Sequence, residues 1–384
     1  MSAFAAQAAE DAAPEPSLDP HQLMPLEIAS GLVFGFAPLV SQAPSAENGA
    51  PRAREALERA ILPALVRAPC LMSFSGGAAS SAILAVAVQL ARREGLELPV
   101  AATNRIDGLA GAQAARQEQV IIRLGLTDWI RFDFNDELDL VGPVAMRVLR
   151  RHGFLWPSHA HAAMPLIEWA AGGSLITGLG QRNALGEPGG LLCRDPGPLP
   201  WLRRSAQRDV RKRWAADVAS RPRSERRPPW WWAALRQVQI AIELLRRLGA
   251  ELRVEVCHPL IDPVFTSALG ELPANQASPG ALFGDLLPPK LLAQPPTPTH
   301  LNGFWGRHSR ELVEAWNGED VDPALVDPEA LRLQWSLPRP DARTFLLLQA
   351  VALSHASRST AAPVVGAQPI GSESGQAEPS GHPA

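Results

Sequence analysis

Short apolar runs alternate with longer amphipathic segments along the first half of the chain. The apolar runs predict buried strands at residues 71–74, 99–103, 129–134 and 174–177. Apolar residues three and four positions apart predict helices at residues 52–66, 78–94, 113–124, 137–151 and 162–171. Strands that alternate with helices in this way form parallel sheets whose two faces are covered by helices. The pattern therefore predicts an α/β fold with a doubly wound, mostly parallel sheet.

The second half of the chain is richer in arginine and has longer helical patterns. Residues 203–227 are Arg-rich and interrupted by proline, and we interpret them as a solvated helical surface rather than a contact for RNA or a peptide. Of Trp230, Trp231 and Trp232, we expect two in the core and one exposed. Further helices are predicted at residues 230–248, 310–316 and 342–355. We expect a mainly helical C-terminal lobe.

The chain is expected to divide into a tail, a linker, one large domain and a second tail. Residues 1–20 and 359–384 are too poor in large apolar groups to offset the entropy lost on folding, so we expect disorder there. Residues 21–51 form an N-terminal segment and linker, in which residues 24–36 are apolar enough to pack on the main body. The large domain spans residues 52–358, with an α/β core at 52–190 and the helical lobe at 191–358.

Composition narrows the class of protein. A net charge of -3 gives no reason to expect nucleic acid as a partner. Nearly all the positive charge comes from arginine, because the only lysines are Lys212 and Lys290. The cysteines, Cys70, Cys193 and Cys257, are far apart and predict no disulfide framework, which favours a reducing cytoplasm. No apolar run approaches the roughly 20 residues needed to span a bilayer. We expect a cytoplasmic protein without a membrane partner.

The first predicted strand ends in a Ser-Gly-Gly turn that leads directly into a helix. Residues 70–81 read Cys-Leu-Met-Ser-Phe-Ser-Gly-Gly-Ala-Ala-Ser-Ser. The glycines allow the backbone to approach a ligand, and the N–H groups of a helix N-terminus bind phosphate. The residues expected to contact such a ligand are Ser73, Ser75, Gly76, Gly77, Ser80 and Ser81. The alternative, which the residues leave open, is a strand–helix turn that meets no ligand.

Four further segments accompany this turn in a recognisable order. They are Val-Ala-Ala-Thr-Asn at 100–104, Ser-Leu-Ile-Thr-Gly-Leu-Gly at 174–180, Val-Glu-Val-Cys-His-Pro-Leu-Ile-Asp at 254–262, and Leu-Pro-Pro-Lys-Leu-Leu at 287–292. Together the five resemble the synthetase domain of the asparagine synthetase family, whose relatives include β-lactam synthetases and lasso-peptide cyclases. The resemblance covers roughly residues 52–355, and the glutaminase half of the full-length enzymes is not matched. It implies a sheet of the adenine-nucleotide α-hydrolase-like type.

The resemblance also implies a reaction and a set of binding residues. In this family ATP adenylates a carboxylate, pyrophosphate leaves, and an amine then displaces AMP. ATP is therefore the candidate cofactor. Thr103 would lie at the strand end that meets adenine, and Gly178 and Gly180 belong to the family's Thr-Gly-x-Gly turn. Arg182 could occupy the volume of the metal ion and supply a fixed positive charge to phosphate oxygens.

Three charged positions of the family pattern are not matched. The carboxylate of the first loop falls on Ala79, and the acidic pair of the later turn falls on Arg182 and Asn183, or one place earlier. The catalytic lysine falls near Thr297. These losses would remove the groups that bind Mg²⁺ and offset the charge on leaving pyrophosphate. We thus expect no metal site, no confident catalytic residue, and a pseudoenzyme or binding partner of an asparagine synthase-like ligase.

An active ATP-dependent, amide-forming ligase remains the alternative function. It would act on a peptide or natural-product carboxylate through a rearranged metal site. Another carboxylate, from Asp195, Glu187 or Asp285, would then have to reach the first loop. In the pseudoenzyme interpretation the partner would be an adenine nucleotide, or a protein or peptide of a biosynthetic pathway.

Other polar residues have both a structural and a functional interpretation. His159 and His161 could suggest a metal site, but side chains two positions apart on a helix point apart, which favours a structural role. Glu118 is expected on a solvated helix face, and Asp262 is expected to cap a helix or fix a turn. Lys290 could replace the missing lysine only if its loop folds back.

Overall fold

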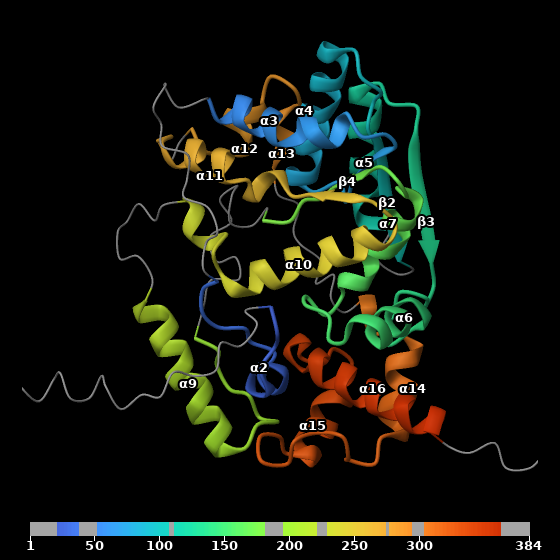
Figure 1. Ribbon diagram of the computed structural model, residues 1–384, viewed down its shortest axis with the longest axis vertical. Coiled ribbons are helices and arrows are strands. Elements are labelled where there is room, and N and C mark those ends of the chain that lie inside the picture. The colour runs from blue at the N-terminus through green and yellow to red at the C-terminus, as the bar shows by residue number, and fades with distance from the viewer. Residues whose placement is uncertain are drawn as a thin grey trace, which may run out of the picture.

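A central sheet of five parallel strands organises the upper part of the molecule (Figure 1). The computed structural model describes residues 21–37, 52–106, 111–180, 195–220, 229–273, 276–293 and 303–361. Its strands are β1 (Cys70–Ser73), β2 (Val100–Ile106), β3 (Trp129–Phe134), β4 (Ser174–Ile176) and β5 (Glu255–Cys257). Their order is β3-β2-β1-β4-β5, so the chain reverses direction across the sheet between β1 and β4. In such sheets ligands bind beyond the carboxyl ends of the strands at this reversal.

Helices cover both faces of the sheet, because successive strand residues point to opposite sides. Met72 and Ile176 pack in the apolar cluster of one face, whereas Leu71 and Leu175 pack in the cluster of the other. The first face is covered by α3 (Ala53–Leu65), α4 (Ala78–Glu94), α5 (Gly111–Leu124), α11 (Pro263–Gly270), α12 (Pro279–Phe283) and α13 (Pro289–Leu292). The second is covered by α6 (Pro143–His152), η1 (Ala160–Ala163), α7 (Met164–Trp169) and α10 (Arg236–Glu251).

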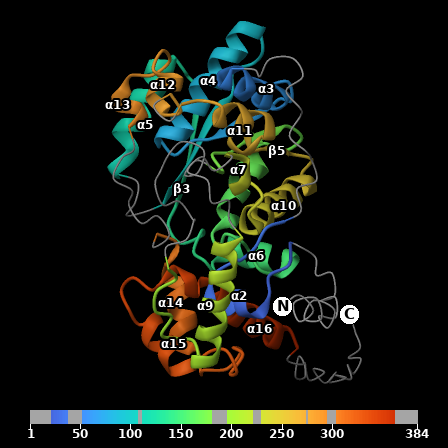
Figure 2. The same ribbon diagram turned by 90° about the vertical axis from the view of Figure 1, so that its left-hand side faces the viewer.

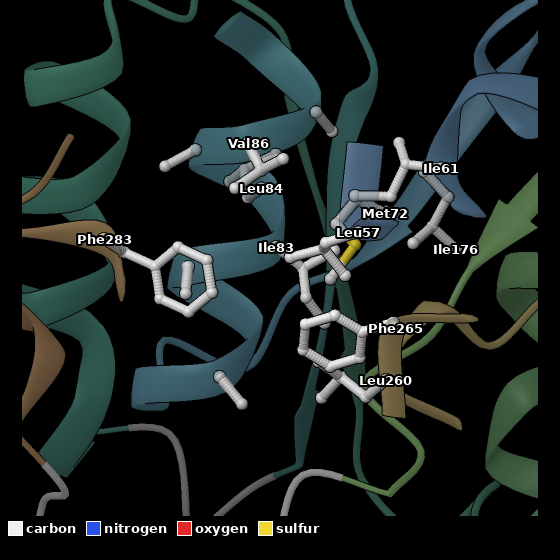
Figure 3. Packing of buried hydrophobic residues seen from close by; sticks show 14 of the residues in the cluster. Leu57, Ile61, Met72, Ile83, Leu84, Val86, Ile176, Leu260, Phe265 and Phe283 are labelled. Atoms are coloured by element: carbon white, nitrogen blue, oxygen red, sulfur yellow. The ribbon is translucent and has the colours of Figure 1, made fainter. Parts of the chain in front are cut away.

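The helix that follows the Ser-Gly-Gly turn is the most deeply buried one in this layer. α4 begins after Gly77 and ends at Gly95, whose φ of +67° stops the helix in the left-handed conformation. Its many alanines let neighbouring elements approach closely, while Ile83 and Leu84 fill the space between them. Figure 3 shows these side chains among residues of α3, β1, β4, α11 and α12.

A second group of helices forms the lower part of the molecule (Figure 2). It comprises α2 (Pro25–Ser30), α9 (Arg204–Ala219), α14 (Arg307–Ala315), α15 (Pro328–Trp335), η5 (Ala342–Thr344) and α16 (Phe345–Ala361). Aromatic pairs hold this group together: Trp316 and Trp335 meet edge to face with ring centres 4.9 Å apart, and Trp305 stacks on Phe345. Leu26 and Ala29 of α2 pack into the same apolar cluster, which confirms that residues 24–36 pack on the main body.

A buried ion pair fixes the N-terminal segment. Glu27 is fully buried, and its carboxylate accepts hydrogen bonds from the N–H groups of Met24 (2.9 Å) and Phe34 (3.1 Å). The guanidinium of Arg236, on α10, donates to the same carboxylate and to the carbonyl of Gln22. A buried charge is tolerated only when it is paired and hydrogen-bonded in this way. The pair therefore determines where residues 21–35 lie against α10.

The α/β fold class and all four predicted strands are confirmed, with β5 as a strand that the sequence analysis missed. The helix expected at residues 137–151 is wrong over its first turns, because α6 begins only at Pro143. There the carboxylate of Asp139 accepts hydrogen bonds from Val141 N–H (3.0 Å), from Ser309 N–H (3.1 Å) and from the Ser309 hydroxyl. Asp139 therefore holds residues 137–142 in turns.

The remaining predictions concern the tails, the linker, the division of the large domain and membrane-spanning helices. The predicted C-terminal tail at residues 359–384 begins too early, because residues 359–361 belong to α16, which ends at Ala361. Residues 1–20 and 362–384, and most of the linker, lie outside the described residues. The division of the large domain at residue 190 stays a prediction. Across the described ranges, the structure contains no helix with both the length and the apolar character required to cross a bilayer.

Candidate functional site

The segments singled out in the sequence meet at the carboxyl ends of β1, β2 and β4. Met72 pairs with Ile176 and Ser73 pairs with Ala102, so the residues after these strands emerge side by side. The structure thus brings together the turn at residues 73–81, Thr103, and the turn at residues 178–180. Gln181, Arg182, Asn183, Glu187 and Thr297 lie outside the described residues.

The hydroxyls of the Ser-Gly-Gly turn form hydrogen bonds within the turn itself. The Ser75 hydroxyl lies 3.1 Å from the Ser80 hydroxyl and accepts from Gly77 N–H at 3.3 Å. The Ser80 hydroxyl lies 3.2 Å from the Gly77 carbonyl oxygen and donates to it. Gly76 has a φ of +77°, which favours glycine. These contacts stabilise the turn without a ligand.

Two residues of α5 hold the turn from outside. The Gln117 amide donates to the Ser75 carbonyl at 3.0 Å, and a Cβ added at Gly76 would lie only 2.6 Å from Gln117 Cγ. The Arg116 Nε donates to the Gly76 carbonyl at 2.7 Å, and its other nitrogens donate to the Lys290, Leu291 and Ala293 carbonyls at 3.1, 2.5 and 2.6 Å. Burial lowers the pKa of Arg116. The pair ties the turn to α13.

Glu118, the residue singled out in the sequence, lies next to Gln117 on α5. Glu118 is exposed, as expected for a solvated helix face, whereas Gln117 is buried. A signal for Gln117 was present, because it lies three and four positions before the buried Val120 and Ile121. A polar residue in the apolar stripe of a helix requires a hydrogen-bond partner. For Gln117 this partner is the Ser75 carbonyl of the Ser-Gly-Gly turn.

Ala79, where the family places its loop carboxylate, points into the protein core. Its exposed fraction is 1%, and it packs in the apolar cluster of the first sheet face. A carboxylate there would lose its hydration in apolar surroundings. The neighbouring Ser81 is fully buried, and within the described ranges its hydroxyl has no hydrogen-bond partner.

Thr103 was predicted at a strand end, but it lies within β2, three residues before the end of the strand at Ile106, and its hydroxyl is already bonded. It donates to the Phe74 carbonyl at 2.6 Å and accepts from Trp129 Nε1 at 3.0 Å. The Arg131 guanidinium stacks on the Trp129 ring, 4.6 Å from its centre. Trp129 and Arg131 thus cover this side of the strand.

The turn after β4 packs against the end of β5 and the tryptophan segment. The Thr177 hydroxyl lies 2.6 Å from His258 Nδ1 and accepts from Leu179 N–H at 3.3 Å. Burial lowers the pKa of His258 to about 4, so the ring is neutral near pH 7. Gly180 has a φ of +92°, and a Cβ there would lie 2.5 Å from Ile261 Cγ2 and 2.8 Å from Trp232. Glycine is therefore required by packing at this position.

The tryptophan segment, η2 (Pro229–Trp232), contributes mainly to the core. Trp231 and Trp232 are each 3% exposed, as expected for two of the three tryptophans. The indole N–H of Trp232 and the Nε2 atom of His258 are buried, and no partner for either is found among the residues that the structure describes. Both atoms belong to segments packed around the turn after β4.

The residues first considered as metal ligands have structural contacts. His159 stacks on Phe304 with ring centres 5.4 Å apart, and the fully buried His161 places Nε2 2.9 Å from the Leu138 carbonyl. Burial also lowers the pKa of His161. Asp262 caps α11 as expected, accepting from Val264 and Phe265 N–H at 2.9 and 3.1 Å. In the described part of the chain, no three His, Cys, Asp or Glu side chains are grouped for a metal ion.

The carboxylates proposed as replacements have contacts elsewhere. Asp285 pairs with Arg54 at 2.6 Å, and the same guanidinium donates to Gln89. Gln89 is eleven residues along α4 from Ala78, which is about 16 Å at 1.5 Å per residue. Asp195 is exposed and accepts from Gly197 N–H at 2.9 Å. Asp285 therefore lies at the wrong end of α4 to complete the loop.

Neither Cys70, which is buried, nor Cys257, which is partly buried, has the character of a nucleophile. Burial raises the pKa of the Cys70 thiol to about 11 and that of the Cys257 thiol to about 12. A thiol with so high a pKa stays protonated near neutral pH.

Two cavities lie among the lower helices, away from the Ser-Gly-Gly turn. One of about 590 Å³ lies between α14 and α15, and one of about 690 Å³ lies between α2 and α9.

Comparison with known proteins adds no relative. No protein-family model matches the chain, and no curated protein matches it. The resemblance to the asparagine synthetase family therefore depends on the order of the motifs in the sequence alone.

Proposed function

We propose that this chain is a non-catalytic, asparagine synthase-like protein, with the adenine-nucleotide α-hydrolase-like arrangement of the AMP-forming amide ligases. It would act as a binding partner for a protein or peptide of a biosynthetic pathway. The observation that carries the proposal is the burial of Ala79, which takes the place of the loop carboxylate and is 1% exposed. Metal-assisted phosphoryl chemistry needs that carboxylate to face the nucleotide.

The hydrogen bonds around the turn support the same conclusion. A phosphate bound there would compete with the mutual contacts of Ser75 and Ser80, and adenine would compete with the bonds of Thr103. Gln117 and Arg116 hold the turn in this state. A site that satisfies its own donors gains less from a ligand, because binding must first break those bonds.

A second candidate function is nucleotide binding without Mg²⁺. It is favoured by the buried polar atoms without described partners, namely Ser81 Oγ, Trp232 Nε1 and His258 Nε2. Such atoms are costly to leave unsatisfied, and a bound ligand could supply their hydrogen bonds. Arg182 would then provide the charge for the phosphates. The ligase with a rearranged metal site lacks a comparable observation.

Two measurements test the proposal. The first is calorimetric titration of the protein with ATP, with and without Mg²⁺. The second is an assay for AMP and pyrophosphate over a panel of carboxylic acids and amines. We expect neither binding nor product. Binding that is independent of Mg²⁺ and weakened by Arg182→Gln, but not by the control Arg123→Gln on α5, would support the second candidate. Formation of AMP and pyrophosphate would refute both.

A further inference from the structure

α9 packs on the rest of the protein along one face only. Its buried residues are Ala206, Val210 and Asp217, and Asp217 accepts a hydrogen bond from Gly35 N–H at 3.0 Å. In both overall views the helix runs along the outside of the molecule beside α2 (Figures 1 and 2). The rest of its surface is therefore open to solvent.

The open face carries a basic stripe, which consists of Arg204, Arg208, Arg211 and Lys212. Three- and four-residue spacings place these side chains on one side of a helix. All four are exposed, and within the described ranges none forms an ion pair. Asp209 lies at the edge of the stripe, and Asp217 is buried on the opposite face. The stripe therefore carries four positive charges, and Asp209 at its edge is the one negative charge on the exposed face of α9.

The N-terminal segment enters the described structure next to this stripe. The cavity of about 690 Å³ between α2 and α9 has Met24 and Lys212 in its wall, and Arg213 contacts the Met24 sulfur at 3.4 Å. Asp209 and Asp322 line the same cavity together with Lys212 and Arg213, so the charges of its wall balance, whereas the stripe beside it is mainly positive. Residues that precede Met24 start within reach of Lys212.

Those preceding residues carry only negative charge. Residues 1–20 contain Glu10, Asp11, Glu15 and Asp19, and no lysine or arginine. The nine steps from Asp19 to Glu10 can span up to about 30 Å when extended, whereas the eight helical steps from Arg204 to Lys212 cover about 12 Å. The acidic segment is therefore long enough to follow the whole stripe.

We propose that the acidic residues 10–19 of this chain dock on the basic stripe of α9. Each exposed ion pair is weak and screened by salt, but several act together here. Attachment at residue 21 gives the segment a high local concentration, which makes weak pairs sufficient. A membrane surface fits less well, because Val218 is the only large apolar side chain exposed on α9. Nucleic acid is disfavoured by the negative net charge of the chain.

Zero-length carbodiimide crosslinking of the full chain tests the proposal, since it joins carboxylates to lysines and the chain has only Lys212 and Lys290. We expect mass spectrometry to find Lys212 joined to Glu15 or Asp19, in a yield that falls at least threefold in 0.5 M NaCl. The triple variant Arg204→Gln, Arg208→Gln, Arg211→Gln, which keeps Lys212, should lower the yield as much. The control Arg59→Gln, Arg123→Gln should leave it unchanged.

Several results would overturn the proposal. The first is a set of crosslinks in which Lys212 is joined only to Asp209 or Asp322, its neighbours in the cavity wall. The yield could be the same with and without the three arginines, which would mean that the tether alone produces the crosslink. In an equal mixture of ¹⁵N-labelled and unlabelled protein, crosslinks only between copies would assign the stripe to a second molecule instead.

Discussion

The Thr177 hydroxyl oxygen lies 2.6 Å from the Nδ1 atom of His258, and this contact joins the ends of β4 and β5. Leu179 N–H donates to the same hydroxyl oxygen, and burial keeps the His258 ring neutral near pH 7. In the tautomer with its proton on Nε2, Nδ1 accepts the hydroxyl proton of Thr177. Protonation of the ring would remove this acceptor and place a charge in a buried site.

Stability should therefore fall as the pH is lowered. The pKa of His258 is about 4 in the folded protein and about 6.5 in the unfolded chain, so the unfolded chain binds more protons between these values. The contribution is complete above about pH 6.5 and is lost progressively down to about pH 4. We expect a loss of up to about 3 kcal/mol in the free energy of unfolding, measured by urea denaturation.

The variant His258→Asn separates this effect from other titrating groups. Asparagine can still accept from Thr177, but it does not titrate. His161 has a lowered pKa and contributes in the same direction in both proteins, so only the difference between them reports on His258. An equal loss of stability in wild type and variant would contradict the assignment.

A carboxylate introduced at position 79 should destabilise the protein. Ala79→Asp would place a charge in the apolar cluster around α4, and we expect the free energy of unfolding to fall by about 3 kcal/mol at pH 8. Burial would raise the pKa of the new carboxyl, so the loss should shrink as the pH falls and the group is protonated. The neutral Ala79→Asn controls for size and should lack this pH dependence. A stable variant that binds Mg²⁺ would contradict the proposed function.

Two glycines with the same backbone conformation allow the role of the turn to be measured. Gly76→Ala should cost about 2 kcal/mol, because its φ is +77° and the new Cβ would meet Gln117 Cγ at 2.6 Å. Gly95→Ala has a φ of +67° but nothing within 4 Å, so we expect only the backbone cost of about 1 kcal/mol. Equal losses in chemical denaturation would mean that Gln117 does not hold the turn tightly.

The buried ion pair of the N-terminal segment should be far stronger than an exposed one. Glu27→Gln leaves Arg236 without its charged partner, and we expect a loss of about 3 kcal/mol in the free energy of unfolding. The exposed Glu168, paired with Arg147 at 2.5 Å, provides the comparison, and Glu168→Gln should cost less than about 1 kcal/mol. Similar losses from the two variants would show that the buried pair is not stabilising.

Hydrophobic periodicity was sufficient for the α/β core because its elements are long or fully apolar. The bounds of α4 and β3 agree with the prediction, and Ala53–Leu65 lies within one residue of it. β5 was missed because Glu255–Cys257 begins with an exposed charged residue and has no fully buried one, unlike the equally short but buried β4; it becomes a strand by pairing with β4. The turns at residues 137–142 depend on Ser309, 170 residues later. Contacts of that kind leave no local signal.

The site was predictable in outline but not in detail. Sequence order was enough to bring the Ser-Gly-Gly turn and Gly178 to one edge of the sheet, because strand ends meet there in any parallel sheet. Thr103 lies inside β2 and reaches the turn through its bond to the Phe74 carbonyl. What occupies that edge depends on side chains from other elements. Gln117, Arg116 and Trp129 approach it from α5 and β3, and only the three-dimensional arrangement shows that they use its donors and acceptors.

The long separation of Glu27 from Arg236 has a consequence for synthesis of the chain. The two residues are 209 positions apart, so at roughly 10 residues per second a ribosome adds Arg236 about 20 s after Glu27. During that interval α2 has neither its cation nor α16, which is made later still. α2, the first helix of the described chain, can therefore pack in its final place only after most of the protein has been translated.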